Sequence, residues 1–342
     1  MQYSVNYIYF YAYYLSMKKY DAIVIGAGSG LIISSKAAAI GKKVAVIEEA
    51  EMGGTCLNRG CIPSKILIHH ADIVRTINEA HKFGIKAKLL DIDYRKIITE
   101  TNKFVSSESK KIERGNKANK NIDIYKTRAE FVSRNVVRAG NKEIFGRKIF
   151  ICAGTRVSVP PIPGLQKVDY LTSTEALKLK KKPKTITVIG GGYIAAELAY
   201  FFHGMGSNVN IIERAGKLLS NSDNEISEKF TEIASEMYNV MLGADIMRVY
   251  KSENKYIVEV KHKGKVKKVL SDALLVAAGR RPNTDLLKVE NAGVKVNKYG
   301  YIKVNPYLET SQRNIWAIGD IAGVYQFKHS ANLEAVYAFS NA

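Results

Sequence analysis

Two cysteines, Cys56 and Cys61, stand five positions apart in the stretch GGTCLNRGCIPSK, which runs from residue 53 to residue 65. Such a pair could bind a metal, staple the fold or carry redox chemistry. The chain has only three cysteines, so it is not a disulfide scaffold, and a structural bridge would be unusual in a reducing cytosol. Zinc normally takes four ligands, and no second Cys or His pair completes a set here. The surrounding sequence has to decide between these roles.

A glycine-rich turn follows an apolar run just before this stretch, in KKYDAIVIGAGSG at residues 18–30. A helix-like segment and a second apolar run come next, and the latter ends at Glu48, 22 residues after Gly26. In a dinucleotide-binding βαβ unit, Gly26 permits the tight turn, Gly28 lets the backbone approach a pyrophosphate, and the acid binds ribose hydroxyls. The third glycine position is Leu31, and we expect Gly30 beside it to compensate in part.

The pattern occurs a second time in TITVIGGGYIA, residues 185–195. Gly190 and Gly192 take the first two positions, Ala195 takes the third, and Glu213 follows 23 residues after Gly190. An acid at this point favours NAD over NADP, because it would repel a 2′-phosphate. Two basic residues follow closely and leave some use of NADP open, Arg214 and Lys217. Two complete units predict an α/β fold with two dinucleotide sites and electron transfer between their cofactors.

The cysteine spacing can now be interpreted. Residues five apart on a straight helix rise about 7.5 Å, beyond the roughly 4.4–6.8 Å between the Cα atoms of a disulfide. A bridge therefore needs a distorted turn, which Gly60 can supply. Pro63 suits the opening turn of a helix, whose dipole would stabilise a Cys61 thiolate. A redox-active pair is the interpretation that fits these surroundings best.

The stretch GGTCLNRGCIPSK resembles the active-site signature of the flavin-dependent pyridine nucleotide–disulfide oxidoreductases, and its IPSK ending is most similar to dihydrolipoyl dehydrogenase. Further landmarks of that family follow in order: KIFICAGTRVSVPPIPG at 148–164, LLVAAGRRPNTD at 274–285 and RNIWAIGDIAG at 313–323. The resemblance implies a three-layer β/β/α sandwich fold with two Rossmann-like domains. The FAD-binding domain would comprise residues 17–155 and 285–342, and the NAD-binding domain residues 156–284.

The resemblance also implies roles for individual residues. Cys56 would form the mixed disulfide with a dithiol substrate, and Cys61 would be the thiol next to the flavin. Lys65 would lie beside the flavin N5 and pair with Glu197, and Tyr193 would cover the nicotinamide pocket. The FAD site would include the first glycine turn and Glu48 together with Gly54, Thr55, Ala129, Gly154, Asp320, Lys328, His329 and Ala331. The last three would begin a helix aimed at the flavin pyrimidine. The NAD site would include Gly190, Gly192, Glu213, Ile246 and Gly279.

Composition limits the other function classes. The 342 residues are 46% hydrophobic, as in a soluble protein of about two domains, and the net charge is +20. The lysines are scattered, which favours a solvated surface over a nucleic-acid site. Residues 1–16 carry no charge and are shorter than the roughly 20 apolar residues that span a bilayer. We expect a disordered tail or a mis-assigned start there, no membrane segment and a cytoplasmic location.

Family members usually carry a further dimerisation domain with a histidine–glutamate acid–base pair, and the sequence contains no such motif. The expected homodimer interface is therefore missing. The sequence leads us to expect a dihydrolipoyl dehydrogenase-like oxidoreductase that uses FAD and NAD and acts on a dithiol or disulfide, with a lipoyl domain as a candidate partner. The alternatives are an NAD(P)H-dependent reductase of another disulfide or of a metal ion, and a non-catalytic remnant that keeps only the fold.

Overall fold

The computed structural model describes residues 17–342, and the expectation for residues 1–16 lies outside the described part. The chain divides into two compact units, each built from separate segments. The first contains the chain up to Asn58 with residues 107–156 and 281–342, and the second contains residues 59–106 and 157–280. The boundaries near residues 156 and 281 lie within a few positions of those predicted. Residues 59–106, which we predicted in the first domain, cluster with the second unit instead.

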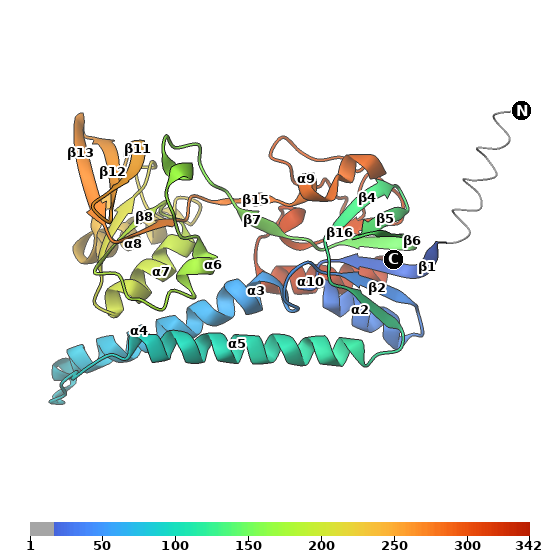
Figure 1. Ribbon diagram of the computed structural model, residues 1–342, viewed down its shortest axis with the longest axis horizontal. Coiled ribbons are helices and arrows are strands. Elements are labelled where there is room, and N and C mark those ends of the chain that lie inside the picture. The colour runs from blue at the N-terminus through green and yellow to red at the C-terminus, as the bar shows by residue number, and fades with distance from the viewer. Residues whose placement is uncertain (1–16) are drawn as a thin grey trace, which may run out of the picture. The chain divides into compact units, whose positions relative to one another are not determined.

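The first unit is built on a seven-stranded sheet with strand order β3–β2–β1–β6–β5–β4 and with β16 beside β6 (Figure 1). Its strands are β1 (Lys18–Ile25), β2 (Val44–Ile47), β3 (Ile122–Tyr125), β4 (Ala129–Ser133), β5 (Val136–Ala139), β6 (Lys142–Ile151) and β16 (Ile315–Ala317). Strands β1, β2, β3, β6 and β16 run parallel, and β4 and β5 add an antiparallel meander. Strand β6 thus belongs to both, since β5 pairs with its first half and β16 with its second half.

Alternating side chains of β1 fill the cores on the two faces of this sheet, as a period of two residues requires. Ala22 and Val24 face α2 (Gly30–Ala39) and α10 (Lys328–Asn341). Ile23 and Ile25 face a second core that also contains residues of β4, β5, α9 (Thr284–Leu287) and η3 (Val289–Ala292). The unit therefore has a helical layer, a parallel sheet and an antiparallel meander.

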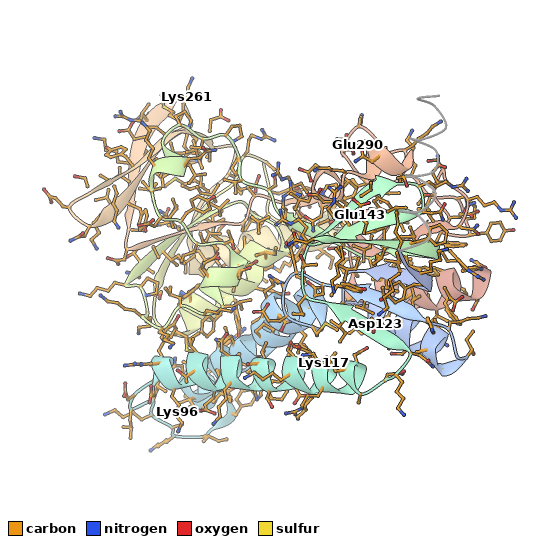
Figure 2. All side chains as sticks on the ribbon, turned by 45° about the vertical axis from the view of Figure 1, so that its right-hand side comes forward. Lys96, Lys117, Asp123, Glu143, Lys261 and Glu290 are labelled. Atoms are coloured by element: carbon orange, nitrogen blue, oxygen red, sulfur yellow. The ribbon has the colours of Figure 1, made fainter. Side chains whose placement is uncertain are left out.

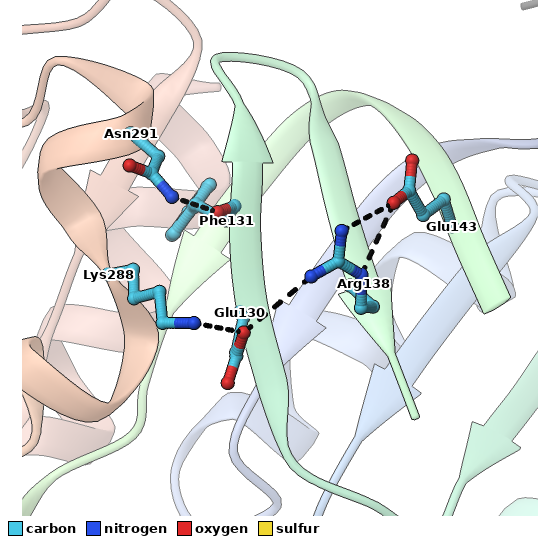
Figure 3. A network of polar contacts seen from close by, with 6 residues as sticks. All are labelled: Glu130, Phe131, Arg138, Glu143, Lys288 and Asn291. Atoms are coloured by element: carbon cyan, nitrogen blue, oxygen red, sulfur yellow. Dashed lines mark hydrogen bonds and ion pairs between the residues drawn. The ribbon is translucent and has the colours of Figure 1, made fainter. Parts of the chain in front are cut away.

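A polar network fastens the last chain segment of this unit to the meander (Figure 3). Lys288 forms an ion pair of 2.8 Å with Glu130 on β4, and Asn291 donates a hydrogen bond of 2.8 Å to a β4 carbonyl. Arg138 on β5 lies 3.8 Å from Glu130 and 2.8 Å from Glu143 on β6. The hydrogen bond from Lys288 is the main reason that the pKa of Glu130 lies below its ordinary value. The network joins η3 to the meander across more than 150 residues of sequence.

The second unit repeats the same three layers. Its parallel sheet has the order β10–β9–β8–β14, with β8 (Thr185–Ile189), β9 (Asn208–Ile212), β10 (Asn239–Met241) and β14 (Ala273–Val276). One face packs on α4 (Cys61–Glu79), α6 (Ser173–Ala176), α7 (Tyr193–Gly204) and α8 (Asn224–Met237). The other face packs on the antiparallel strands β11 (Asp245–Ser252), β12 (Lys255–His262) and β13 (Lys265–Ser271). The prediction of an α/β protein with two Rossmann-like domains is confirmed.

Helix α4 explains why residues 59–106 cluster with the second unit. Leu67, Ala71 and Val74 of α4 share one apolar core with Leu198 and Phe202 of α7. The packing is close, because a Cβ atom added to Gly204 would lie 2.7 Å from the Cβ of Ala71. The remaining elements are connections: α3 (Gly54–Arg59), η1 (Ala80–Phe83), α5 (Tyr94–Lys117), η2 (Leu165–Lys167), η4 (Gly319–Ile321) and the paired strands β7 (Thr155–Val157) and β15 (Arg280–Pro282).

Charged side chains lie on the surface of both units. Lys96 and Lys117 on α5 and Lys261 on β12 are exposed, and Figure 2 shows all three at the outside of the ribbon. This agrees with the prediction of a lysine-rich solvated surface. Among the described residues, no helix is long and apolar enough to cross a membrane.

Candidate functional site

The first glycine turn lies between β1 and α2 and is held by backbone contacts. Gly26 has φ +105°, and a Cβ atom there would lie 2.4 Å from the carbonyl oxygen of Cys152, directly after β6. Gly54, with φ +68°, approaches the turn so closely that its Cβ would lie 2.6 Å from the Cα of Gly28. Side chains are excluded at Gly26 and Gly54, and this keeps the turn tight.

Gly30 resolves the question raised by Leu31 at the third glycine position. A Cβ atom on Gly30 would lie 2.7 Å from Cγ1 of Val24 and 3.0 Å from Cβ of Cys152. The first residue of α2 therefore packs directly on β1, which is the contact that the third glycine usually permits. Leu31 is half-buried beside the same core. Gly30 takes over the packing role as expected.

The carboxylate of Glu48 closes the turn. Its Oε2 accepts a hydrogen bond of 2.7 Å from the Ala27 amide, and its Oε1 accepts one of 2.9 Å from the Ala50 amide. The side chain therefore lies at the edge of the glycine turn, where a bound ribose would be expected. The structure places Gly26, Gly28, Gly30, Glu48 and Gly54 together at the carboxyl ends of the parallel strands.

The second glycine turn repeats this arrangement in the second unit. Gly190 has φ +107°, and its Cβ would lie 2.4 Å from the carbonyl oxygen of Ala277, directly after β14. Glu213 accepts hydrogen bonds of 2.5 Å from the Gly191 amide and 2.6 Å from the Ala215 amide. Each carboxylate thus binds the residue after the first glycine and the residue two positions after itself. The two sites share one local design.

Other residues predicted at the second turn lie at different distances from it along the fold. Gly192 precedes α7, and Tyr193 is the first residue of that helix, with 52% of its surface exposed. Gly279 has φ +115°, and its carbonyl accepts a hydrogen bond of 2.9 Å from the Ser158 amide. Ile246 is half-buried on β11 beside the second core of this unit. The roles predicted for these residues stay predictions.

Lys65 and Glu197 meet in the second unit, as the family resemblance implied. The Lys65 ammonium contacts the Glu197 carboxylate, and the two side chains are 62% and 29% exposed. Tyr200, one turn further along α7, donates a hydrogen bond of 2.7 Å to Asp72 on α4. The packing of α4 on α7 therefore sets the Lys65–Glu197 pair in place.

The two cysteines lie on successive helices. Cys56 is half-buried within α3, and Cys61 is exposed as the first residue of α4. Gly60 separates the helices with φ −149° and ψ −122°, so the chain does not continue as one straight helix. Pro63 lies in the first turn of α4, as predicted. The structure thus supplies the break in the helix that we expected at Gly60, and the redox pairing of the cysteines stays a prediction.

Asp320 lies in η4 among polar partners that the sequence did not reveal. Its Oδ2 accepts a hydrogen bond of 3.0 Å from the Thr155 hydroxyl. Glu334 of α10 accepts one of 2.6 Å from the Gly319 amide, and burial raises the pKa of Glu334 above its ordinary value. Gly154 has φ +61° and open space where a Cβ would lie. These residues belong to the same unit as the first glycine turn.

The remaining predicted FAD residues differ in what they can offer. Thr55 is exposed on α3, whereas Ala129 is buried in the core on β4, so only its backbone could reach a ligand. Helix α10 begins at Lys328, as predicted, with His329 exposed and Ala331 buried.

Two carbonyl groups that position the glycine turns escaped the sequence analysis. They belong to Cys152 and Ala277, which follow corresponding strands of the two units. The signal was present, because ICAGT at 151–155 and VAAGR at 276–280 share a strand end followed by Ala-Gly. Cys152 itself is buried, and burial raises its pKa far above the ordinary value, so it is a core residue without redox chemistry. Among the described residues, no cluster of three His, Cys, Asp or Glu side chains could hold a metal ion.

Known proteins resemble this chain along almost its whole length. A mercuric reductase of Lysinibacillus sphaericus is 37% identical over 94% of this chain and 60% of its own length. The Escherichia coli K12 protein RclA, a probable pyridine nucleotide-disulfide oxidoreductase, is 37% identical over 92% of this chain and 68% of its own length. A dihydrolipoyl dehydrogenase of Thermus scotoductus is 35% identical over 95% of this chain and 71% of its own length. The chain spans only 52–60% of the length of the mercuric reductases it matches.

The fold agrees with these similarities. A solved structure of E. coli RclA, an HOCl-induced flavoprotein disulfide reductase, has a TM-score of 0.83 and 35% identity. The match covers 93% of this chain and 69% of that chain. The family model described as pyridine nucleotide-disulphide oxidoreductase matches residues 20–335. This family depends on FAD and involves a pyridine nucleotide. The chain belongs to the pyridine nucleotide-disulphide oxidoreductase family.

Proposed function

We propose that this chain is a FAD-dependent dithiol/disulfide oxidoreductase of the dihydrolipoyl dehydrogenase type, located in the cytoplasm. It would pass electrons between a dithiol, the Cys56–Cys61 pair, FAD and NAD. The observation that carries the proposal is the contact between Lys65 and Glu197, one turn after Cys61, in a chain with two matching dinucleotide turns. A lipoyl domain is the candidate partner of the whole protein, and a dimer of the kind found in the family would require residues that we did not identify in this sequence.

The residues of the first unit fit FAD. The backbone at Gly28 is accessible, since its added Cβ would meet only the Cα of Gly54 at 3.7 Å, and Gly154 has open space. Helix α2 has no acidic residue in its first turn, so its N-terminus favours an anion. Glu48 and Asp320 offer carboxylates for hydroxyl groups. Bound FAD would supply a carrier for two electrons.

The residues of the second unit fit NAD better than NADP. Glu213 is fixed by two backbone amides beside the second glycine turn. A carboxylate at this place accepts hydrogen bonds from a free 2′-hydroxyl and repels a 2′-phosphate. Lys217, which could favour NADP, instead donates a hydrogen bond of 2.5 Å to Asn224. We therefore propose NAD as the nucleotide.

The cysteines would carry out thiol–disulfide exchange. A substrate thiolate attacks the sulfur of Cys56, the Cys56–Cys61 bond breaks, and Cys61 leaves as a thiolate. The second substrate thiolate then attacks the substrate sulfur of this mixed disulfide and releases Cys56, so that two electrons reach the pair and two protons are released. Cys61 is suited to be the leaving thiolate because it begins α4, where the helix dipole stabilises negative charge.

Reduction of a metal ion or of another disulfide is the second candidate. It is favoured by the 37% identity to a mercuric reductase and by the similarity to RclA, for which a copper(II) complex has been solved. The sequence lacks the additional C-terminal cysteines that mercuric reductases usually carry, so we place the dithiol reaction first. A non-catalytic module that only binds nucleotides is the third candidate.

An anaerobic titration with NADH tests the proposal. The purified protein should be yellow, NADH should bleach its flavin band, and a long-wavelength band from the Cys61 thiolate should appear. Cys61→Ser should abolish the new band and keep the bleaching. NADH oxidation is then compared with lipoamide and with Hg(II), which separates the first two candidates. A colourless protein, or a flavin that does not respond to NADH, would leave only the binding module.

A further inference from the structure

The side chain of Lys328 extends to the first glycine turn. Its ammonium nitrogen lies 3.0 Å from the hydroxyl oxygen of Ser29, which is 299 residues away in sequence. Both residues belong to the first unit. Ser29 is buried between Gly28 and Gly30, and Lys328 is half-buried. The backbone of Lys328 begins α10, but its charge lies at the turn that precedes α2.

Ser29 is oriented to accept a hydrogen bond from this lysine. Its hydroxyl donates a hydrogen bond of 2.9 Å to the side-chain oxygen of Asn332, one turn further along α10. A serine hydroxyl has one proton, so once that proton is donated its lone pairs can only accept. Ser29 also makes no side-chain cap bond to α2. The serine therefore holds the ammonium of Lys328 at the glycine turn.

A positive charge at this place is electrostatically unfavourable in the protein alone. Lys328 is the first residue of α10, a helix of 14 residues, and it contacts the residue that precedes α2, a helix of 10 residues. The N-terminus of each helix carries partial positive charge and disfavours a cation. Neither helix has an acidic residue in its first turn. An anion bound at the turn would interact favourably with both helix ends and with the ammonium.

The nearby carboxylates are held by other groups. Glu48 accepts from the Ala27 and Ala50 amides, Asp320 accepts from Thr155, and Glu334 accepts from the Gly319 amide. These bonds fix all three carboxylates on backbone or hydroxyl donors. The geometry directs the ammonium of Lys328 to the turn where a dinucleotide would place its diphosphate.

We propose that the side chain of Lys328 binds the diphosphate of the dinucleotide held by residues 26–30. This assigns the side chain to the phosphates, in addition to any backbone contact of α10 with the flavin ring. The inference rests on the proposed use of FAD by the first unit. A hydrogen bond from a charged group to a phosphate predicts a contribution of about 10–100-fold to the dissociation constant.

The test compares Lys328→Met with the parent protein and with Lys328→Arg. Apoprotein is titrated with FAD and with ADP by calorimetry, because ADP contains the diphosphate and lacks the flavin. Lys328→Met should raise both dissociation constants by about 10–100-fold, and Lys328→Arg should restore most of the affinity. Lys42→Met, an exposed lysine in the same unit, provides the control for loss of one positive charge. Circular dichroism melts of the apoproteins exclude misfolding as the cause.

Three outcomes would overturn the inference. Dissociation constants within twofold of the parent would show that the ammonium does not contact the ligand. Weaker FAD binding with unchanged ADP binding would place Lys328 at the flavin ring. An equal loss in Lys42→Met would reduce the effect to general electrostatics. If the parent apoprotein binds neither FAD nor ADP, the proposed function fails as well, so the two failures are distinguishable.

Discussion

The contact of Gly30 with β1 predicts the effect of a single methyl group. In Gly30→Ala the new Cβ would lie 2.7 Å from Cγ1 of Val24, closer than non-bonded carbon atoms approach. Overpacking of this kind costs about 1–3 kcal/mol, whereas replacing glycine by alanine in a helix gains at most about 1 kcal/mol. We expect Gly30→Ala to lower the free energy of unfolding of the first unit by about 1 kcal/mol, within a range of about 0–2 kcal/mol.

Gly115 provides a matched control. It lies near the end of α5, is exposed, and has no atom within 4 Å of its added Cβ. Gly115→Ala should therefore stabilise the protein by about 0.5–1 kcal/mol, since only the helix propensity changes. The two substitutions are chemically the same but should shift stability in opposite directions.

The assay follows the only tryptophan of the chain, Trp316, during urea unfolding. Trp316 is 4% exposed, stacks on Phe150, and lies in the same core as Val24, so its fluorescence reports the first unit. Val24→Ala should make room for the new methyl group. The double variant should then be more stable than the sum of the single changes predicts, by about 1 kcal/mol. A stabilising Gly30→Ala, or strict additivity with Val24→Ala, would refute the overpacking argument.

Further predictions concern the charged groups. Glu197→Gln should change stability by less than about 0.5 kcal/mol, because its partner Lys65 is well exposed, yet slow the reduction of bound flavin by NADH up to about 10²-fold in stopped-flow experiments; unchanged kinetics would contradict a role at the flavin. The hydrogen bond from Arg156 lowers the pKa of Asp285, so its stabilisation is present above the ordinary aspartate pKa and is lost as the pH falls through the lowered value. Urea midpoints should therefore fall more between pH 5 and pH 2 in the parent than in Asp285→Asn, and parallel curves would show that the pair is irrelevant. Glu213→Gln should reduce the preference for NADH over NADPH by about tenfold in fluorescence titrations, and an unaltered ratio of dissociation constants would argue against Glu213 as its source.

The sequence predicted those features that short segments encode. Each glycine turn follows an apolar strand and precedes an acid at a fixed interval, so the spacing alone places Gly26, Glu48, Gly190 and Glu213. The contact of Lys65 with Glu197, 132 residues apart, was available only through the family resemblance. The pairing of the cysteines and the contacts with both nucleotides stay predictions.

What the sequence could not predict depends on packing between distant segments. Residues 59–106 cluster with the second unit because Ala71 of α4 meets Gly204 of α7, and no local periodicity encodes that contact. The hydrogen bond from Lys328 to Ser29 joins opposite ends of the chain for the same reason. The carbonyls of Cys152 and Ala277 were missed because backbone atoms carry no residue-specific signal, although the repeated Ala-Gly after each strand could have indicated them.

The interleaving of the two units determines the order in which a ribosome can complete them. All of the second unit has been synthesised by Arg280, whereas the first unit still lacks residues 281–342. At 5–20 residues per second those residues take about 3–12 s to make. During that interval the second half of β6 has no β16 beside it, and the first glycine turn has no Lys328. The second unit can therefore mature during translation, while the first acquires its closing strand and its cation only when the last segment emerges.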